Sequence, residues 1–178
     1  NGRAKWTGDE EALKKRNEWH IIVEGEEVPP PVDTFEEMRL PRGIIERLSE
    51  KGIRRPTPIQ MQGLPAALSG RDMIGIAFTG SGKTLVFVLP MIMRALAEEV
   101  RLPLVSGEGP VGIVVCPSRE LARQTFEVTE EFCEALLRSP PCRCGDGGED
   151  GGGRETGRRR QRQPIGRYPR LRNALCIG

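Results

Sequence analysis

The sequence Ala77-Phe78-Thr79-Gly80-Ser81-Gly82-Lys83-Thr84 carries the strongest structural signal in this chain. It follows a short apolar run over 72–77, which is typical of a buried parallel strand, and it precedes an apolar stretch over 84–97 that predicts a helix. Gly80 and Gly82 allow a sharp turn that brings successive backbone N–H groups toward one point. Together with the helix N-terminus, those groups form a site for phosphate oxygens. We therefore expect a phosphate-binding loop between a strand and a helix.

Lys83 and Thr84 give this loop the chemistry of a nucleoside triphosphate site. A lysine here can reach the β- and γ-phosphates as a point charge, and the threonine hydroxyl can ligate Mg²⁺. We expect both residues to be catalytic and Thr84 to hold the metal. Ala77 stands where the strict pattern has glycine, so the loop is a variant. The alternative is a glycine-rich turn without a ligand, but the agreement of strand, loop and helix favours the phosphate site.

The elements predicted on either side of the loop are helices and strands in alternation. Upstream, apolar residues at helical spacing predict helices around 40–48 and over 58–69. Downstream, the pattern predicts a strand over 111–116, a helix over 119–137 and the start of a third strand over 173–178. This order predicts an α/β fold with a parallel sheet and right-handed crossovers, and we expect three of its strands in this chain.

Three segments of different composition precede that last strand. Residues 1–34 combine a charged helix over 9–20 with Pro29-Pro30-Pro31, which enforces an extended lead-in. Residues 35–138 have the pattern of a globular domain. Residues 139–172 are rich in Gly and Arg and have few apolar side chains, so burial cannot offset the entropy of ordering and disorder is expected.

The charge of the chain is unevenly distributed. Its 178 residues include 27 Lys and Arg against 25 Asp and Glu, a formal net charge of +2. Residues 1–138 hold 18 basic and 21 acidic side chains, whereas 139–178 hold 9 and 4. Any nucleic-acid contact of the globular part must therefore rest on individually placed groups. No uninterrupted apolar stretch approaches the ~20 residues of a bilayer crossing, so no membrane span is expected.

The five cysteines are odd in number and irregularly spaced, which argues against a disulfide framework. Cys142 and Cys144 could form half of a zinc site. However, no second pair follows and His20 is the single histidine, so four ligands are hard to assemble. We expect reduced thiols and no zinc site.

Three ordered blocks together resemble one family. Phe35 stands 17 positions before Gly52-Ile53-Arg54-Arg55-Pro56-Thr57-Pro58-Ile59-Gln60, the phosphate loop follows, and Pro117-Ser118-Arg119-Glu120-Leu121-Ala122 comes after the next strand. They are similar to the Q motif, motif I and motif Ia of the N-terminal RecA-like domain of DEAD-box ATP-dependent RNA helicases, most of all the Abstrakt type. The resemblance covers about residues 10–138 and 173–178, and it implies a partial RecA-like P-loop domain.

The resemblance implies an ATP site. Gln60 resembles the glutamine that reads the adenine edge, and a carboxamide does offer adenine a donor and an acceptor. Phe35 resembles the aromatic residue that packs on the adenine, with a core phenylalanine as the alternative. Thr57 resembles the threonine that supports the phosphate loop, and it can also cap the following helix. The implied ATP–Mg²⁺ ligands are Phe35, Thr57, Gln60, Ala77, Phe78, Thr79, Gly80, Ser81, Gly82, Lys83 and Thr84.

The resemblance also implies an RNA site. Pro117, Ser118 and Arg119 resemble the motif that holds the RNA backbone, and a guanidinium can pair with a phosphate oxygen. The alternative is a solvated first turn of the next helix. Gly178 resembles the first of two glycines in a later RNA-contacting motif.

The departures from the family concern the catalytic groups. The chain contains no Asp-Glu-Ala-Asp sequence, no Ser-Ala-Thr motif and no second RecA-like domain. Because loss of transition-state electrostatics costs orders of magnitude in rate, we expect this chain alone to be inactive. The alternatives are a non-catalytic nucleotide- or RNA-binding fragment and another P-loop protein such as a kinase, which Gln60 disfavours.

The family connection implies RNA and spliceosomal proteins as partners, a role in pre-mRNA splicing, and a nuclear location with the cytoplasm as a second compartment. Residues 139–172 exceed the connection that family members have at this point. They are interpreted either as an Arg/Gly-rich arm with weak RNA affinity or, preferably, as a neutral insertion or the product of a faulty gene model.

Overall fold

The computed structural model describes residues 10–101 and 109–138, which include five helices. The helices are α1 (Glu10–Glu18), α2 (Arg42–Glu50), α3 (Pro58–Leu68), α4 (Lys83–Arg101) and α5 (Arg119–Arg138). Each helix begins within two residues of its predicted start, and α4 extends beyond its predicted end. Among these five, none combines the length and apolar character that a bilayer crossing requires.

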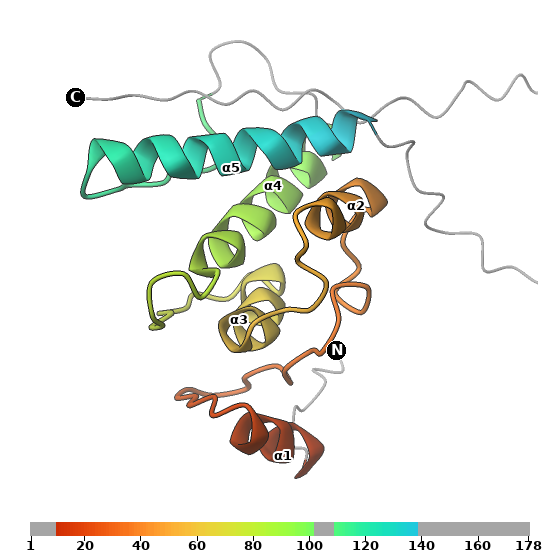
Figure 1. Cartoon of the computed structure of the whole chain (residues 1–178), viewed down its shortest axis with the longest axis vertical. Helices are drawn as coiled ribbons and strands as arrows, with labels where there is room; N and C mark the ends of the chain where they lie inside the picture. Colours follow the sequence, from red (N-terminus) through yellow and green to blue (C-terminus); the bar gives the residue numbers. More distant parts are fainter. Residues whose placement is uncertain (1–9, 102–108, 139–178) are drawn as a thin grey trace, which may run out of the picture.

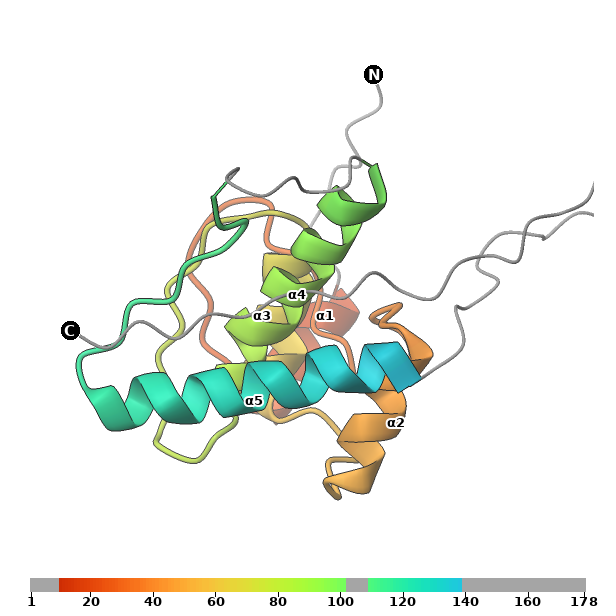
Figure 2. The ribbon, with the colours of Figure 1, turned by 90° about the horizontal axis from the view of Figure 1, so that it is seen from above.

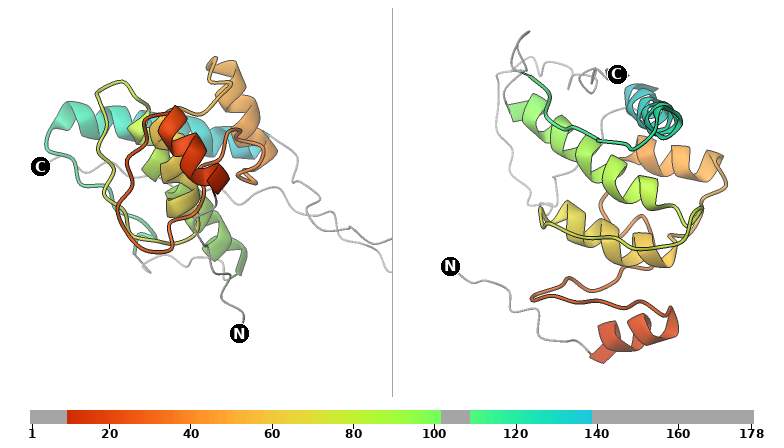
Figure 3. Two further views of the ribbon diagram at one scale, coloured as in Figure 1. Left: turned by 90° about the horizontal axis from the view of Figure 1, so that it is seen from below. Right: turned by 90° about the vertical axis from the view of Figure 1, so that its left-hand side faces the viewer.

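The helices are stacked in layers (Figures 1 and 3). Helix α5 packs on α2 and α4, and α4 packs in turn on α3. Figure 2 shows α5 running across α4. We call residues 19–41 the lead-in segment. On the side of α3 away from α4 lie the first part of this segment and then α1 (Figure 3, right). Helix α3 is therefore held between α4 and the N-terminal part of the chain.

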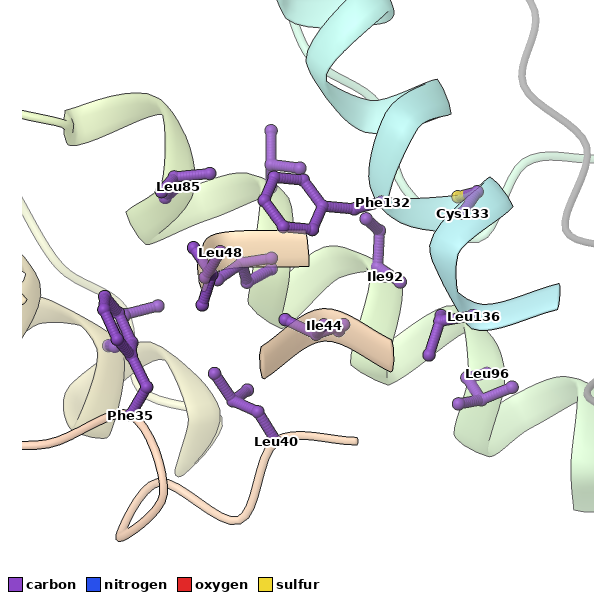
Figure 4. Close-up of a cluster of buried hydrophobic side chains, with 13 residues drawn as sticks. Phe35, Leu40, Ile44, Leu48, Leu85, Ile92, Leu96, Phe132, Cys133 and Leu136 are labelled. Carbon is purple, nitrogen blue, oxygen red and sulfur yellow. The ribbon is translucent and has the colours of Figure 1, made fainter. Parts of the chain in front are cut away.

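The hydrophobic core joins α2, α4 and α5 and is closed by residues from the lead-in segment (Figure 4). The amphipathic patterns of these helices place one apolar face of each toward the others. The buried cluster consists of Phe35, Leu40, Ile44, Leu48, Leu64, Leu85, Val88, Leu89, Ile92, Leu96, Phe132, Cys133 and Leu136. Because it draws on α2, α4 and α5, together with Leu64 of α3 and Phe35 and Leu40 of the lead-in segment, this core fixes α4, whose first residue belongs to the phosphate loop.

Two features of α3 bring other segments close to it. Gly63 faces α4, and a Cβ there would lie 2.7 Å from Cγ1 of Val86, so the crossing needs glycine. Pro65 lacks the N–H that would have bonded the carbonyl of Met61 within the helix. The backbone N–H of Val32 donates to that carbonyl instead, at 2.9 Å. The lead-in segment thus docks where a helix proline has freed an acceptor.

The two predicted strands that fall within the described residues are absent as strands. Neither 72–77 nor 111–116 is hydrogen-bonded in a ladder. Ile74 and Ile76 are 92% and 89% exposed, and Ile113 and Val115 are 75% and 89% exposed. A strand needs a paired neighbour, and a lone pair of strands is marginal in water. The parallel sheet is therefore not confirmed by this part of the chain. The predicted disordered segment 139–172 and the predicted strand 173–178 lie outside the described residues.

Candidate nucleotide-binding site

The predicted phosphate loop connects the 72–77 segment to α4, so the helix that the sequence pattern requires after the loop is present, whereas the strand before it is not. Gly80 and Gly82 have φ angles of +81° and +84°, values that side-chain-bearing residues adopt only with strain. The N–H of Ser81 donates to the carbonyl of Phe78 at 3.2 Å, and the N–H of Leu85 donates to that of Gly82 at 3.2 Å. The loop therefore ends in the first turn of a 19-residue helix.

Two side chains at the N-terminus of α3 bind the loop, and we call this pair of hydrogen bonds the α3–loop contact. The Thr57 hydroxyl donates to the carbonyl of Ser81 at 2.7 Å. The Gln60 amide Nε2 donates to the carbonyl of Gly82 at 3.0 Å. Since a carbonyl and the next N–H point in opposite directions across a trans peptide, both bonds turn the N–H groups of Gly82 and Lys83 away from α3.

The conformation of Gln60 is fixed at its other end as well. Its Oε1 accepts a hydrogen bond from the backbone N–H of Thr57 at 3.0 Å, as part of a capping box at the start of α3. The side chain is 1% exposed. A carboxamide keeps one further N–H and one further lone pair after these bonds, so capacity for a ligand remains.

Gly82 has a second reason to be glycine. A Cβ at this position would overlap the Nε2 of Gln60, in addition to the strain of the positive φ. The sequence pattern predicted the backbone requirement but not this contact. The signal that could have revealed it is the Thr57-x-x-Gln60 spacing of a capping box, which commits Oε1 to the helix and aims Nε2 elsewhere.

The charged and hydroxyl groups of the loop suit an anion. The Lys83 ammonium donates to the carbonyls of Ala77 and of Phe78, the latter at 2.9 Å, and so lies across the entrance of the loop. The buried Ser81 hydroxyl has no hydrogen-bond partner among the described residues. Ala77 and Thr84 are half-buried, whereas Phe78 and Thr79 are exposed. Positive-φ glycines, an ammonium and an unpartnered buried donor fit a phosphate group.

Phe35 lies in the core and not at the loop. It is 2% exposed and belongs to the cluster that joins α2, α4 and α5 (Figure 4). This position matches the alternative of a core phenylalanine, and adenine contact by this ring stays a prediction.

The predicted RNA-contacting residues begin α5, at the end of the 111–116 segment. Pro117, Ser118 and Arg119 are all exposed. The Ser118 hydroxyl accepts the N–H of Leu121 at 3.2 Å, and its carbonyl accepts that of Ala122 at 3.1 Å, so this serine caps the helix. Gly178, the last predicted RNA contact, lies outside the described residues.

No group of three or more His, Cys, Asp or Glu side chains gathers into a metal site within residues 10–101 and 109–138. Cys142, Cys144 and Cys176 lie outside these ranges, so the expectation of no zinc site stays a prediction. The residue of the loop available to a nucleotide-bound Mg²⁺ is Thr84, whose hydroxyl follows Lys83 directly.

Comparison with known proteins shows the family to which this chain is similar. The family model of the DEAD/DEAH box helicases matches residues 57–163. The chain is 63% identical over 163 residues to DEAD-box ATP-dependent RNA helicase 35 of Arabidopsis thaliana, covering 92% of this chain and 23% of that protein. It is 57% identical over 128 residues to the ATP-dependent RNA helicase abstrakt of Drosophila melanogaster, covering 72% and 21%.

Solved structures give the same result for the fold. The RNA helicase Prp28 of Chaetomium thermophilum, bound to ADP, superposes with a TM-score of 0.63 at 32% identity, over 76% of this chain and 33% of that one. The chain thus spans only about a fifth to a third of the length of these relatives. The family model covers the α3–loop contact, the phosphate loop and α5 together. On these grounds the chain belongs to the DEAD/DEAH box helicase family and has the fold of part of its RecA-like domain.

Proposed function

We propose that this chain is the ATP-binding and RNA-backbone-contacting part of an ATP-dependent RNA helicase that unwinds RNA with ATP hydrolysis. The observation that carries the proposal is the α3–loop contact, in which Thr57 and Gln60 hold the carbonyls of Ser81 and Gly82. A single hydrogen bond in this contact joins Gln60, the candidate base-reading side chain, to the candidate phosphate-binding loop. The names of the relatives, all ATP-dependent RNA helicases, support the same activity.

In the proposed complex the phosphate loop supplies most of the binding energy. The ammonium of Lys83 exchanges its backbone carbonyls for the β- and γ-phosphate oxygens, and the backbone N–H groups of the loop donate to the same phosphates. Thr84 is the residue that would hold Mg²⁺, and the ion would neutralise charge at the phosphates. The second N–H and second lone pair of Gln60 face the adenine edge.

The RNA contact is proposed at the start of α5. Pro117, Ser118 and Arg119 are exposed there, and a guanidinium and a helix N-terminus both favour a phosphate oxygen. Gly178 is proposed to extend this contact. Since the described part of the chain is slightly acidic, the contact rests on these placed groups.

We further propose a nuclear role in pre-mRNA splicing, with spliceosomal proteins as partners. The support is a yeast relative described as a DEAD-box splicing factor, Prp28, which superposes with a TM-score of 0.60 at 26% identity.

The chain by itself is proposed to bind ATP without turning it over, because no Asp-Glu-Ala-Asp sequence is present to hold Mg²⁺ and position water. RNA-stimulated phosphate release from purified residues 1–178 tests this. We expect no release above background. Release that Lys83→Ala abolishes would overturn the proposed inactivity and leave ATP binding supported.

The second candidate, a non-catalytic nucleotide- or RNA-binding protein, is favoured by the same missing carboxylates. It differs in one respect: adding the remaining helicase domains would restore no hydrolysis.

A further inference from the structure

A closed triangle of hydrogen bonds connects α1, the lead-in segment and α3. The Arg16 Nε donates to Oε1 of Gln62 at 2.9 Å, and its Nη2 donates to the carbonyl of Pro29 at 3.0 Å. The Gln62 Nε2 donates to the same Pro29 carbonyl at 2.8 Å. Gln62 is 8% exposed and Pro29 is buried, so water competes little for these bonds. The triangle fixes both ends of the Gln62 amide.

The triangle lies immediately beside the α3–loop contact in sequence. Along α3, Gln60 bonds the phosphate loop, the Met61 carbonyl accepts from Val32 of the lead-in segment, and Gln62 bonds Arg16. Three consecutive residues of one helical turn therefore hold three different segments of the chain. The first part of the lead-in segment and α1 lie on the far side of α3 from α4 (Figure 3, right). Arg16 can thus influence the nucleotide site through α3.

A neighbouring ion pair holds α1 in place. The Lys15 ammonium lies 2.7 Å from Oδ2 of Asp33 in the lead-in segment, next to Val32. Ala12, one helical turn before Arg16, is buried. Helix α1 therefore has few core contacts of its own and is attached mainly by Lys15 and Arg16.

We propose that Arg16 is a positioning residue for adenine-nucleotide binding: by bonding Gln62 and Pro29 it holds the first turn of α3 so that Gln60 faces the nucleotide. This inference rests on the proposed function, because it assigns Arg16 to the site where Gln60 reads adenine. The planar fork of a guanidinium serves two acceptors at once, which a lysine ammonium on a shorter stem does not reproduce. The role therefore depends on guanidinium geometry and not on charge alone.

The experiment compares two probes on the full chain: Mg²⁺-ATP, and inorganic tripolyphosphate, which contacts the phosphate loop but has no base. The test variants are Arg16→Ala, Arg16→Lys and Gln62→Ala. Lys14→Ala is the matched control, since Lys14 is an exposed cation on the same helix. Gln60→Ala and Lys83→Ala serve as references for the nucleotide site. Thermal unfolding of each variant without ligand separates loss of folding from loss of binding.

We expect Arg16→Ala and Arg16→Lys to weaken ATP binding by roughly three- to tenfold, the size of one or two lost hydrogen bonds. Tripolyphosphate binding stays within about twofold of the unmodified chain, because the loop and Lys83 are intact. Arg16→Ala combined with Gln62→Ala weakens ATP binding by less than the product of the single effects, since both remove the same triangle. Lys14→Ala changes neither affinity.

Two results would overturn the inference alone, and a third would overturn the proposed function as well. If Gln60→Ala lowers ATP affinity but the Arg16 variants do not, Arg16 has no positioning role while the ATP site stands. If the Arg16 variants lower both affinities equally along with the unfolding temperature, the triangle is only a folding contact. If the unmodified chain binds no ATP, the proposed function fails, and the inference fails with it.

Discussion

Gln60 and Gly82 are matched across the contact between α3 and the phosphate loop: the amide of one bonds the carbonyl of the other at 3.0 Å. The absence of a Cβ on Gly82 leaves the room that this amide occupies. The two residues are 22 positions apart and belong to different predicted motifs. Their contact joins the proposed base-reading side chain directly to the proposed phosphate-binding loop.

Gly82→Ala is expected to lower ATP affinity at least about tenfold, because a methyl group would displace Gln60 and the positive φ would be strained. Gly70→Ala is the matched control. Gly70 has a φ of +77°, yet a Cβ there would meet nothing within 4 Å. The control should lower the unfolding free energy by about 1 kcal/mol and leave ATP affinity unchanged. Titration calorimetry and chemical denaturation measure the two effects. Equal ATP affinities for the two variants would contradict the steric role of Gln60.

Thr57→Val is expected to destabilise the start of α3 and to weaken the α3–loop contact, because it removes the hydroxyl that donates to the carbonyl of Ser81. The loss of a helix-capping side chain costs about 1 kcal/mol of unfolding free energy. Thr57→Ser keeps the hydroxyl and should retain most of the stability and ATP affinity. Differential scanning calorimetry with and without ATP distinguishes them. A serine variant as weak as the valine variant would show that the methyl group, not the hydroxyl, matters.

The helices were predictable and the strands were not, for a physical reason. Helix hydrogen bonds close within one segment, so the apolar spacing around Leu48 and Phe132 suffices to place α2 and α5. A strand depends on partners elsewhere, and the runs at Ile74–Ile76 and Ile113–Val115 find none within the described residues.

The candidate site was only partly predictable. The loop pattern predicted the glycine turn, whose backbone geometry the structure has at Gly80 and Gly82. The Arg16–Gln62 bond spans 46 positions, and no local pattern contains it. The sequence favoured adenine contact for Phe35 and left a core position as the alternative, and only packing distinguishes a core residue from an exposed ring. The hydrogen bond from Val32 to the carbonyl of Met61 could have been anticipated in part. Pro65 has no N–H, and any proline inside a helix leaves free the carbonyl four residues earlier.

The apolar runs that form no strand are expected to drive self-association. Large exposed apolar side chains in unpaired backbone segments promote pairing between chains. The double variant Ile74→Lys/Ile76→Lys should remain monomeric at higher protein concentrations than the unmodified chain. Its unfolding temperature should change little. Ile22→Lys is the control, since Ile22 is 91% exposed outside these runs. Light scattering after size-exclusion chromatography measures the effect. An unfolding temperature lowered as in a core variant would show that these isoleucines are packed.

Glu131 is expected to make stability weakly dependent on pH. Lys51, at 2.5 Å, and Arg47, at 3.3 Å, hold the pKa of Glu131 below its ordinary value. The contribution is therefore fully present above the unfolded-state pKa of about 4.3 and is lost as pH falls through the lower folded-state pKa. Solvent screens this half-exposed group, so the effect is at most about 0.5 kcal/mol.

Urea unfolding of Glu131→Gln at pH 7 and at pH 3 tests this dependence, with Glu130→Gln, at an exposed neighbour, as the control. The Glu131 variant should be less stable than the control at pH 7, and the difference should shrink at pH 3 and in high salt. A difference that grows on acidification would have the wrong sign for an ion pair between α2 and α5.

Titration calorimetry of the full chain with Mg²⁺-ATP gives the sharpest test of the proposed nucleotide site. We predict saturable binding of one ATP per chain, reduced at least about tenfold by Lys83→Ala and by Gln60→Ala, because the first removes the phosphate charge and the second removes the link between base and loop. ATP affinities that both variants leave unchanged would contradict the assignment of this loop and of Gln60 to ATP.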